Sequence, residues 1–291
     1  LSLLGSRVPL SLKIFLTAFA VVDDIGGILV IAIFYSSHVS YGYILVAVLL
    51  YILLYFIGKR GATNKIFFLV IGVVIWYLFL QSGIHSTISG VILAFVIPAK
   101  PRLDVGKYIE HIRHTIAGFP VMESGSIVLT NEQIAKLKEV ESASDRVISP
   151  LQSFEDNLHG AVNYLILPLF AFVNAGVVFS GGGELVGDVG IAVAAGLLFG
   201  KFAGIYFFTW LAIKIKLTPM PPGMTWTNLS GIALLGGIGF TVSLFIANLS
   251  FGANFPILLN QAKFGVLSGT ILSGLLGYIV LWIVLPARRR K

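Results

Sequence analysis

Long apolar runs separated by short polar connections dominate the chain. A helix needs about 17 to 25 predominantly apolar residues to cross the roughly 30 Å hydrocarbon core of a bilayer. The third and fourth runs abut at Gln81-Ser82-Gly83, so a tight turn or a single bent helix is expected there. The pattern therefore predicts an all-α membrane protein with about eight spans, at residues 12–35, 42–58, 66–82, 83–98, 158–180, 189–213, 228–251 and 262–285.

One polar stretch, residues 99–157, interrupts the series of apolar runs. Thr130-Asn131-Glu132-Gln133 has the spacing of a capping box and predicts a short amphipathic helix. Ser149-Pro150 predicts the N-cap and first position of the next helix. A solvated connector without a role of its own explains this stretch best, and ordinary surface residues explain Glu110, His111 and His114 better than a metal site. The chain is thus divided into membrane spans (1–98), a polar cytoplasmic loop (99–157) and further spans (158–291).

The positions of the basic residues indicate how the chain is oriented in the membrane. Of the 20 Lys and Arg residues, 18 fall on one side if the eight spans alternate, and only Lys201 and Lys263 do not. The positive-inside rule places this side, with both termini, in the cytoplasm, so the net charge of +7 does not indicate nucleic acid. The absence of cysteine excludes disulfides and thiolate metal sites. The sequence starts with Leu1 without a signal peptide pattern, so we expect the interior of a longer protein.

Three ionisable residues lie at the centres of predicted spans. Asp23 and Asp24 occupy the middle of FLTAFAVVDDIGGILVIAIFY, and Lys201 lies midway between Val189 and Ile213. A charged residue at the bilayer centre costs roughly 2.5 to 3.5 kcal/mol. A structural ion pair would need only one aspartate. Two adjacent acids with one lysine instead predict a coupled titrating site that holds either protons or a hard cation, and hence antiport by alternating access.

The stretch LLGGIGFTVS, residues 234–243, combines three glycines with a threonine and a serine inside a predicted span. Close helix packing through small residues would explain the glycines alone. Beside the buried acids and lysine, a helix broken at mid-membrane is favoured. Among weaker signals, His85 could titrate near neutral pH or cap a turn. Pro168 and Asn174 indicate a kink and an interhelical hydrogen bond.

The motifs VVDDIGG, LPLFAFVNAGV, LLFGKFAGI and GGIGFTVSLFIANLSFG together resemble the NhaA-type sodium/proton antiporters of bacteria. The resemblance runs through the chain in order, apart from the polar loop. It implies a twelve-span inverted-repeat fold, of which we expect the first four spans to lie upstream of Leu1. The family's usual dimer-forming hairpin is absent.

The resemblance also assigns roles to residues. It implies that Asp23 and Asp24 bind sodium and protons, with Asp24 the more essential ligand, and that Lys201 pairs with Asp23. Gly237, Gly239 and Thr241 would belong to the broken helix. FEDNLH implies Glu155 and His159 as pH sensors, with His85 a weaker candidate, although Asp156 stands where the family often has His.

These observations predict a transporter of the bacterial inner membrane rather than an enzyme. Its cargo would be sodium or lithium and protons, with no cofactor. Membrane lipid and a second copy are the expected partners, and nucleic acid is not. A coupled symporter of related fold and an inactive antiporter fragment remain alternatives. An intramembrane aspartyl protease would place its acids on separate helices, and a cation channel would not pair an acid with Lys201.

Overall fold

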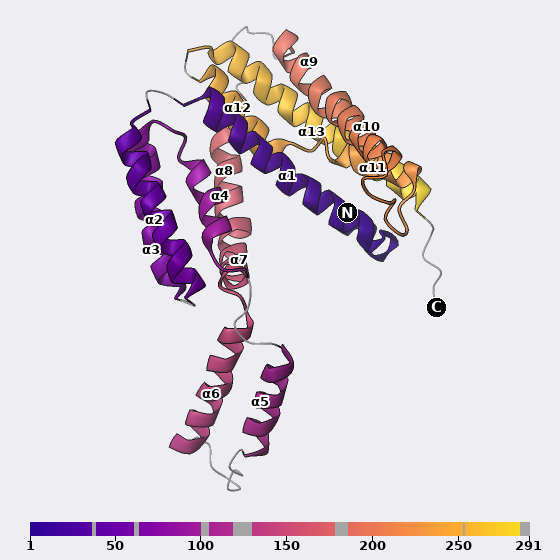
Figure 1. Cartoon of the computed structure of the whole chain (residues 1–291). Coiled ribbons are helices and arrows are strands. Elements are labelled where there is room, and N and C mark those ends of the chain that lie inside the picture. Colours follow the sequence, from indigo (N-terminus) through magenta and orange to yellow (C-terminus); the bar gives the residue numbers. More distant parts are fainter. Residues whose placement is uncertain are drawn as a thin grey trace. The chain divides into compact units, whose positions relative to one another are not determined.

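The computed structural model describes residues 1–36, 39–60, 64–99, 105–118, 130–177, 186–252 and 254–285. Every regular element in these ranges is a helix, as the sequence predicted (Figure 1). The chain forms two compact units, one of Leu1–Ile31 with Ile166–Lys291 and the other of Ala32–Leu165. Packing joins the first span to C-terminal helices in one unit, and the division into the segments 1–98, 99–157 and 158–291 stays a prediction.

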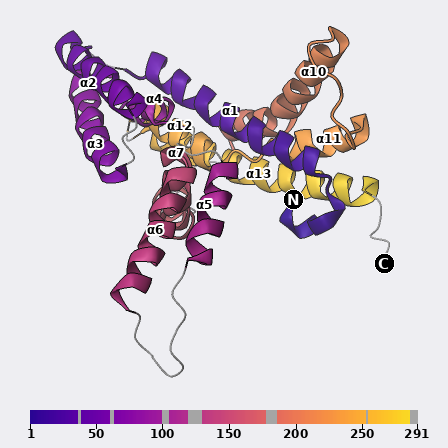
Figure 2. The ribbon, with the colours of Figure 1, turned by 60° about the horizontal axis from the view of Figure 1, so that its bottom comes forward.

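The first unit contains the helices that carry the predicted site. Its long helix α13 (Pro256–Val284) packs against α9 (Asp188–Ala195), α11 (Trp226–Leu235) and α12 (Phe240–Phe251), as Figures 1 and 2 show. The same unit holds most of α1, preceded by the 3-10 turn η1. The remaining elements are α8, the π-helical turn η3 and α10. Their bounds are Ser2–Arg7 for η1, Leu10–Phe34 for α1, Leu167–Asn174 for α8, Gly196–Gly200 for η3 and Lys201–Lys214 for α10.

Leu12 ties α1 to the rest of this unit. It is fully buried in one cluster with Leu229 of α11 and Leu281 of α13. Glycines allow α13 to approach its neighbours closely. A Cβ atom at Gly269 would lie 3.1 Å from the Cα atom of Ala194 in α9. Close backbone approach of this kind is the usual way in which membrane helices associate, since apolar side chains gain little by leaving lipid.

The second unit contains α2, α3 and α4, which pack around the buried Leu54, Phe68 and Ile75. It also contains the paired helices α5 and α6, then α7 and the π-helical turn η2 (Figures 1 and 2). The bounds are Tyr41–Lys59 for α2, Lys65–Ser82 for α3, Thr87–Val96 for α4, Val105–Ala117 for α5, Asn131–Val147 for α6, Pro150–Ala161 for α7 and Val162–Ile166 for η2.

The membrane spans match the prediction only in part. Five helices of the described residues are long and apolar enough to cross a membrane, and the bent pair α11–α12 would make a sixth. They are α1, α2, α3, the continuous segment Asp188–Lys214 and α13. The protein is therefore a multi-pass membrane protein, but the number of eight spans stays a prediction.

Two predicted spans differ from the helices in the structure. For the span 83–98, α3 ends at Gly83 in a left-handed conformation (φ 81°), which the expected turn requires. The following α4 has only 10 residues, because it ends at Ile97 in extended backbone, the conformation favoured before Pro98. For the span 158–180, the helical residues end at Asn174 after the π-turn η2, and residues 178–180 lie outside the described ranges.

The local signals of the polar loop are confirmed. The N–H of Thr130 donates to Oε1 of Gln133 (2.9 Å), and the N–H of Gln133 donates to Oγ1 of Thr130 (3.2 Å), which is a complete capping box. The Oγ atom of Ser149 accepts from the N–H of Gln152 (3.1 Å), so Ser149 caps α7. His111 pairs with Glu139 (3.5 Å), and no cluster of three His, Cys, Asp or Glu residues that could hold a metal occurs in the described ranges.

Tyr51 links α2 to α4 inside the second unit. Its hydroxyl donates to the carbonyl oxygen of Ser89 (2.7 Å), and its side chain is buried. Tyr51→Phe should lower the free energy of unfolding by about 1 kcal/mol, since it removes this buried hydrogen bond between the two helices. Thermal unfolding in detergent measures the change. Tyr55→Phe, at a 51% exposed position on the same helix, should leave the midpoint unchanged, and equal midpoints for both variants would contradict the prediction.

Candidate functional site: two acids, a lysine and a broken helix

Helix α1 places Asp23 and Asp24 near the middle of its 25 residues. The surrounding residues are almost all apolar, so the helix continues through the two acids without a break. Successive residues of an α-helix point about 100° apart. The two carboxylates therefore belong to adjacent residues of α1 but point in different directions.

Lys201 reaches Asp23 from another helix of the same unit. Its Nζ atom donates to Oδ2 of Asp23 at 2.5 Å, with 23% of the lysine side chain and 36% of the aspartate side chain exposed. This is the pair that the family resemblance implied. Asp24 is within Coulombic range of both residues. No hydrogen bond or ion pair engages its carboxylate in the described part of the chain, so the two acids are unequal.

Lys201 directly follows the π-helical turn η3, which the sequence analysis did not predict. A π-turn inserts one extra residue into a helix and rotates everything after it, and such turns often occur at functional sites. The pair Gly196 and Gly200 at the two ends of the turn is the only sequence signal, and it is weak. The turn sets the direction in which the Lys201 side chain leaves its helix.

At the predicted break the structure has two helices, α11 and α12, which are bent by 44° at Gly236–Gly239; that this break lies at mid-membrane stays a prediction. Gly236, Gly237 and Ile238 donate to carbonyl oxygens of α11 (2.9 to 3.1 Å). Among backbone hydrogen bonds of the described residues, none uses the N–H groups of residues 239–242 or the carbonyl groups of residues 236–238. Within a membrane, backbone groups without helical partners are tolerated where they line a cavity or are buried in protein.

The three residues assigned to the break have different surroundings. Gly239 and Thr241 line the cavity described below, whereas Gly237 does not. A Cβ atom at Gly237 would clash with the backbone carbonyl oxygen of Leu197 and would lie 2.5 Å from Oγ of Ser273 in α13, so this position needs a glycine for close packing. A Cβ atom at Gly239 would lie 2.9 Å from Oγ of Ser243 and 3.5 Å from Nζ of Lys201. Because Gly239 has no side chain, the space between the Ser243 hydroxyl and the Lys201 ammonium group stays open.

A cavity of about 710 Å³ joins these groups within the first unit. One wall is α1 from Leu16 to Val30, and the facing wall is formed by Lys201 and the residues around the break. The sequence analysis assigned no role to Ser243 in this wall, although its spacing of four residues from Gly239 puts both on one face of α12. The polar lining is supplied by Asp23, Asp24, Lys201, Gly239, Thr241 and Ser243.

The proposed pH sensors belong to the second unit. Glu155 and His159 are exposed on α7, and a ring nitrogen of His159 lies 3.0 Å from Nδ2 of Asn163. Nδ1 of His85 lies 3.0 Å from Oγ1 of Thr87 at the start of α4. These contacts are local to each helix. Their role in sensing stays a prediction.

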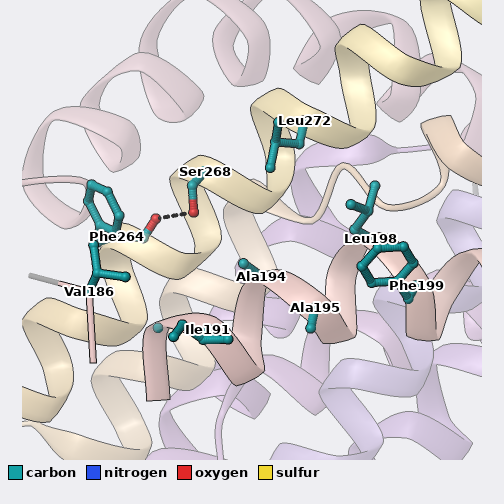
Figure 3. A pocket seen from close by; sticks show the side chains of 10 residues that line it. Val186, Ile191, Ala194, Ala195, Leu198, Phe199, Phe264, Ser268 and Leu272 are labelled. Carbon is teal, nitrogen blue, oxygen red and sulfur yellow. Dashed lines mark hydrogen bonds between the residues drawn. The ribbon is translucent and has the colours of Figure 1, made fainter. Parts of the chain in front are cut away.

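A second cavity of the first unit, of about 260 Å³, lacks the groups that bind ions. Figure 3 shows its walls, formed by side chains of α9, η3 and α13 such as Ile191, Phe199 and Leu272. Its hydroxyl group, Oγ of Ser268, already donates to the carbonyl oxygen of Phe264 (2.9 Å). No charged side chain lines it. Of these two cavities in the described part of the first unit, only the larger is lined by charged groups that could bind a cation.

Comparison with known proteins gives a consistent result. The chain is 95% identical over 291 residues to the Na(+)/H(+) antiporter NhaA of Bacteroides thetaiotaomicron, and 48% identical over 301 residues to that of Parabacteroides distasonis. It is 40% identical over 285 residues to Na(+)/H(+) antiporter NhaA 1 of Psychromonas ingrahamii. These alignments cover 97 to 100% of this chain and 64 to 66% of each relative, so the chain spans about two thirds of their length. A family model described as Na+/H+ antiporter 1 matches residues 1–281, and the chain therefore belongs to this antiporter family.

Proposed function

We propose that the protein exchanges sodium, or lithium, for protons across the bacterial inner membrane. The observation that carries this proposal is the inequality of two carboxylates in one cavity. Asp23 is bonded to Lys201, whereas no described residue bonds Asp24. A carboxylate near backbone and hydroxyl oxygens suits a small hard cation. Asp24 is thus the proposed ligand of the transported ion. Asp23 is the second acid of the site, and Lys201 offsets its negative charge.

Exchange follows from competition for these acids. A proton on Asp24 removes the charge that attracts sodium, and a bound sodium ion keeps protons away. Asp23 forms an ion pair with Lys201, and both residues line the same cavity as Asp24, so a change of charge at one of the three groups acts on the other two. If the cavity opens to each side in turn, one site carries the two ions in opposite directions.

The broken helix supports this chemistry with its backbone. The first turn of α12 has N–H groups without backbone partners, and a helix N-terminus carries a partial positive charge. Placed at the cavity wall, this charge offsets part of the negative charge of the two acids. It can stabilise the emptied site without competing with the cation for a ligand.

The same family suggests further roles for residues outside the cavity. We infer cytoplasmic termini from the predicted distribution of Lys and Arg, with the C-terminal residues 286–291 outside the described ranges. Glu155 and His159, and more weakly His85, are the proposed pH sensors. Membrane lipid and a second copy of the chain are the proposed partners.

Proteoliposomes test the proposed exchange and distinguish it from symport. The complete gene product is reconstituted with an acidic lumen and a trapped pH-sensitive dye. External sodium should make the lumen more alkaline, because sodium entry is coupled to proton exit. Further acidification would indicate symport, and no pH change beyond protein-free vesicles would contradict the proposal.

Competition also predicts how the apparent KM for sodium depends on pH. Where protons occupy most of the site, mass action raises that KM by up to about tenfold for each pH unit of acidification. The maximal rate should change less than the KM over the same range. A KM that is independent of pH across the active range would contradict a shared site.

A further inference from the structure

We infer that Asn248 and Asn174 are positioning residues that set the cavity end of α12. The inference deepens the proposed function and rests on it. Nδ2 of Asn248 in α12 donates to Oδ1 of Asn174, the last residue of α8, at 3.0 Å. Neither residue lines the cavity. The pair is the interhelical hydrogen bond that the sequence predicted for Asn174.

Both amides are held in place by their own helices. Nδ2 of Asn174 also donates to the carbonyl oxygen of Phe170 (2.9 Å), and Nδ2 of Asn248 to that of Leu244 (3.0 Å). These i to i−4 bonds fix the orientation of each side chain. The bond between them therefore has a defined direction, from α12 to α8.

The break makes α12 depend on such a contact. A continuous helix would take its orientation from α11, but the chain bends by 44° at Gly236–Gly239. The orientation of α12 must therefore come from its lateral contacts, and these include α13 and α8. Leu244, which is fully buried, packs in one cluster with Leu197 of η3 and Val266 of α13. Asn248 lies one turn beyond Leu244 and adds the polar contact.

Helix geometry connects this contact to the cavity. Thr241 and Asn248 are seven residues apart, about two turns, and lie on the same face of α12. A tilt or rotation of α12 at Asn248 is transmitted along the rigid helix to Thr241 and Gly239. Those residues line the cavity beside the acids and Lys201. Loss of the amide bond should thus alter the cavity while its own residues stay unchanged.

Lys263 offers a matched control at the same end of α8. Its Nζ atom donates to the carbonyl oxygen of Gly176, just after α8, at 3.4 Å. This contact joins α8 to α13 rather than to α12. Lys263→Gln weakens the end of α8 without loosening α12, so it separates general destabilisation from misplacement of α12.

The test compares N248L, N174L and N174L/N248L with K263Q in proteoliposomes of the complete gene product. Each asparagine variant should raise the KM for sodium about fivefold, with the maximal rate within about twofold of the parent. The double variant should match the single ones, because all three lose the same bond. K263Q should leave the KM unchanged.

Hydrogen exchange of residues 239–243 gives a readout independent of turnover. Sodium should protect this segment in the parent protein and protect it less in N248L. If the parent shows neither transport nor sodium-dependent protection, the proposed function itself fails. If the parent shows both and N248L has the parent's KM and protection, with only its thermal midpoint lowered, the positioning role is overturned. Additive increases in KM in the double variant would overturn it as well.

Discussion

Replacement of Asp24 by asparagine should abolish sodium-dependent proton movement, lowering its rate by at least about a hundredfold. Asparagine keeps the size of the side chain but removes the negative charge that would attract the proposed cargoes, sodium and protons. No described residue bonds the Asp24 carboxylate, so its removal breaks no contact on which the fold depends. Transport assays in proteoliposomes and the thermal midpoint in detergent measure the two effects separately.

Asp188→Asn is the matched control for this substitution. Asp188 is an exposed aspartate in the first turn of α9, at the start of the span that carries Lys201, and does not line the cavity. D188N should therefore transport at the rate of the parent. D24E, which keeps the charge at a greater length, should retain partial activity. A D24N protein that keeps more than a tenth of the parent rate would exclude Asp24 as the obligatory ligand.

The pairing of Lys201 with one of the two aspartates was predictable from the sequence, because few arrangements of buried charges are stable in a membrane. A lysine and two aspartates at the centres of apolar spans are too costly to remain apart, so they had to share a polar site. The sequence alone could not tell which aspartate meets the lysine. The choice depends on the rotation of the helix around Lys201, which the π-turn Gly196–Gly200 sets. Only the family resemblance indicated Asp23.

The broken helix was predictable in kind but not in detail. Glycines marked the place, yet the same residues could have served close packing, and Gly237 does so against Ser273. Hydropathy also did not give the ends of the helices. Residues 83–98 are apolar enough to cross a membrane, but a left-handed glycine and Pro98 limit α4 to 10 residues. Apolar composition measures affinity for lipid, whereas local backbone preferences decide where a helix ends.

Lys201 pairs with Asp23 and not with Asp24, so a double substitution can measure the coupling energy of that one ion pair. Among the described residues, its ammonium is the only hydrogen-bond or ion-pair partner of Asp23, and the pair lies at the wall of the cavity. Removing one member of such a pair leaves an uncompensated charge, whereas removing both leaves none. Because 36% of the Asp23 side chain is exposed, solvent reduces the penalty below that of a fully buried pair.

Lys201→Met should lower the free energy of unfolding by about 1 to 3 kcal/mol, with a fall of about 2 to 4 °C in thermal midpoint for each kcal/mol. The double variant D23N/K201M should regain more than half of that loss, since it carries no unpaired charge. Lys214→Met on the same helix removes only a cation–π contact, in which Nζ of Lys214 lies 4.4 Å from the centroid of the Trp210 ring. This variant should lower the free energy of unfolding less than Lys201→Met does. Additive losses from D23N and K201M would show that the pair has no coupling energy. In transport, both Lys201 variants should show a pH profile different from the parent's, because each removes a positive charge from the wall of the proposed ion site.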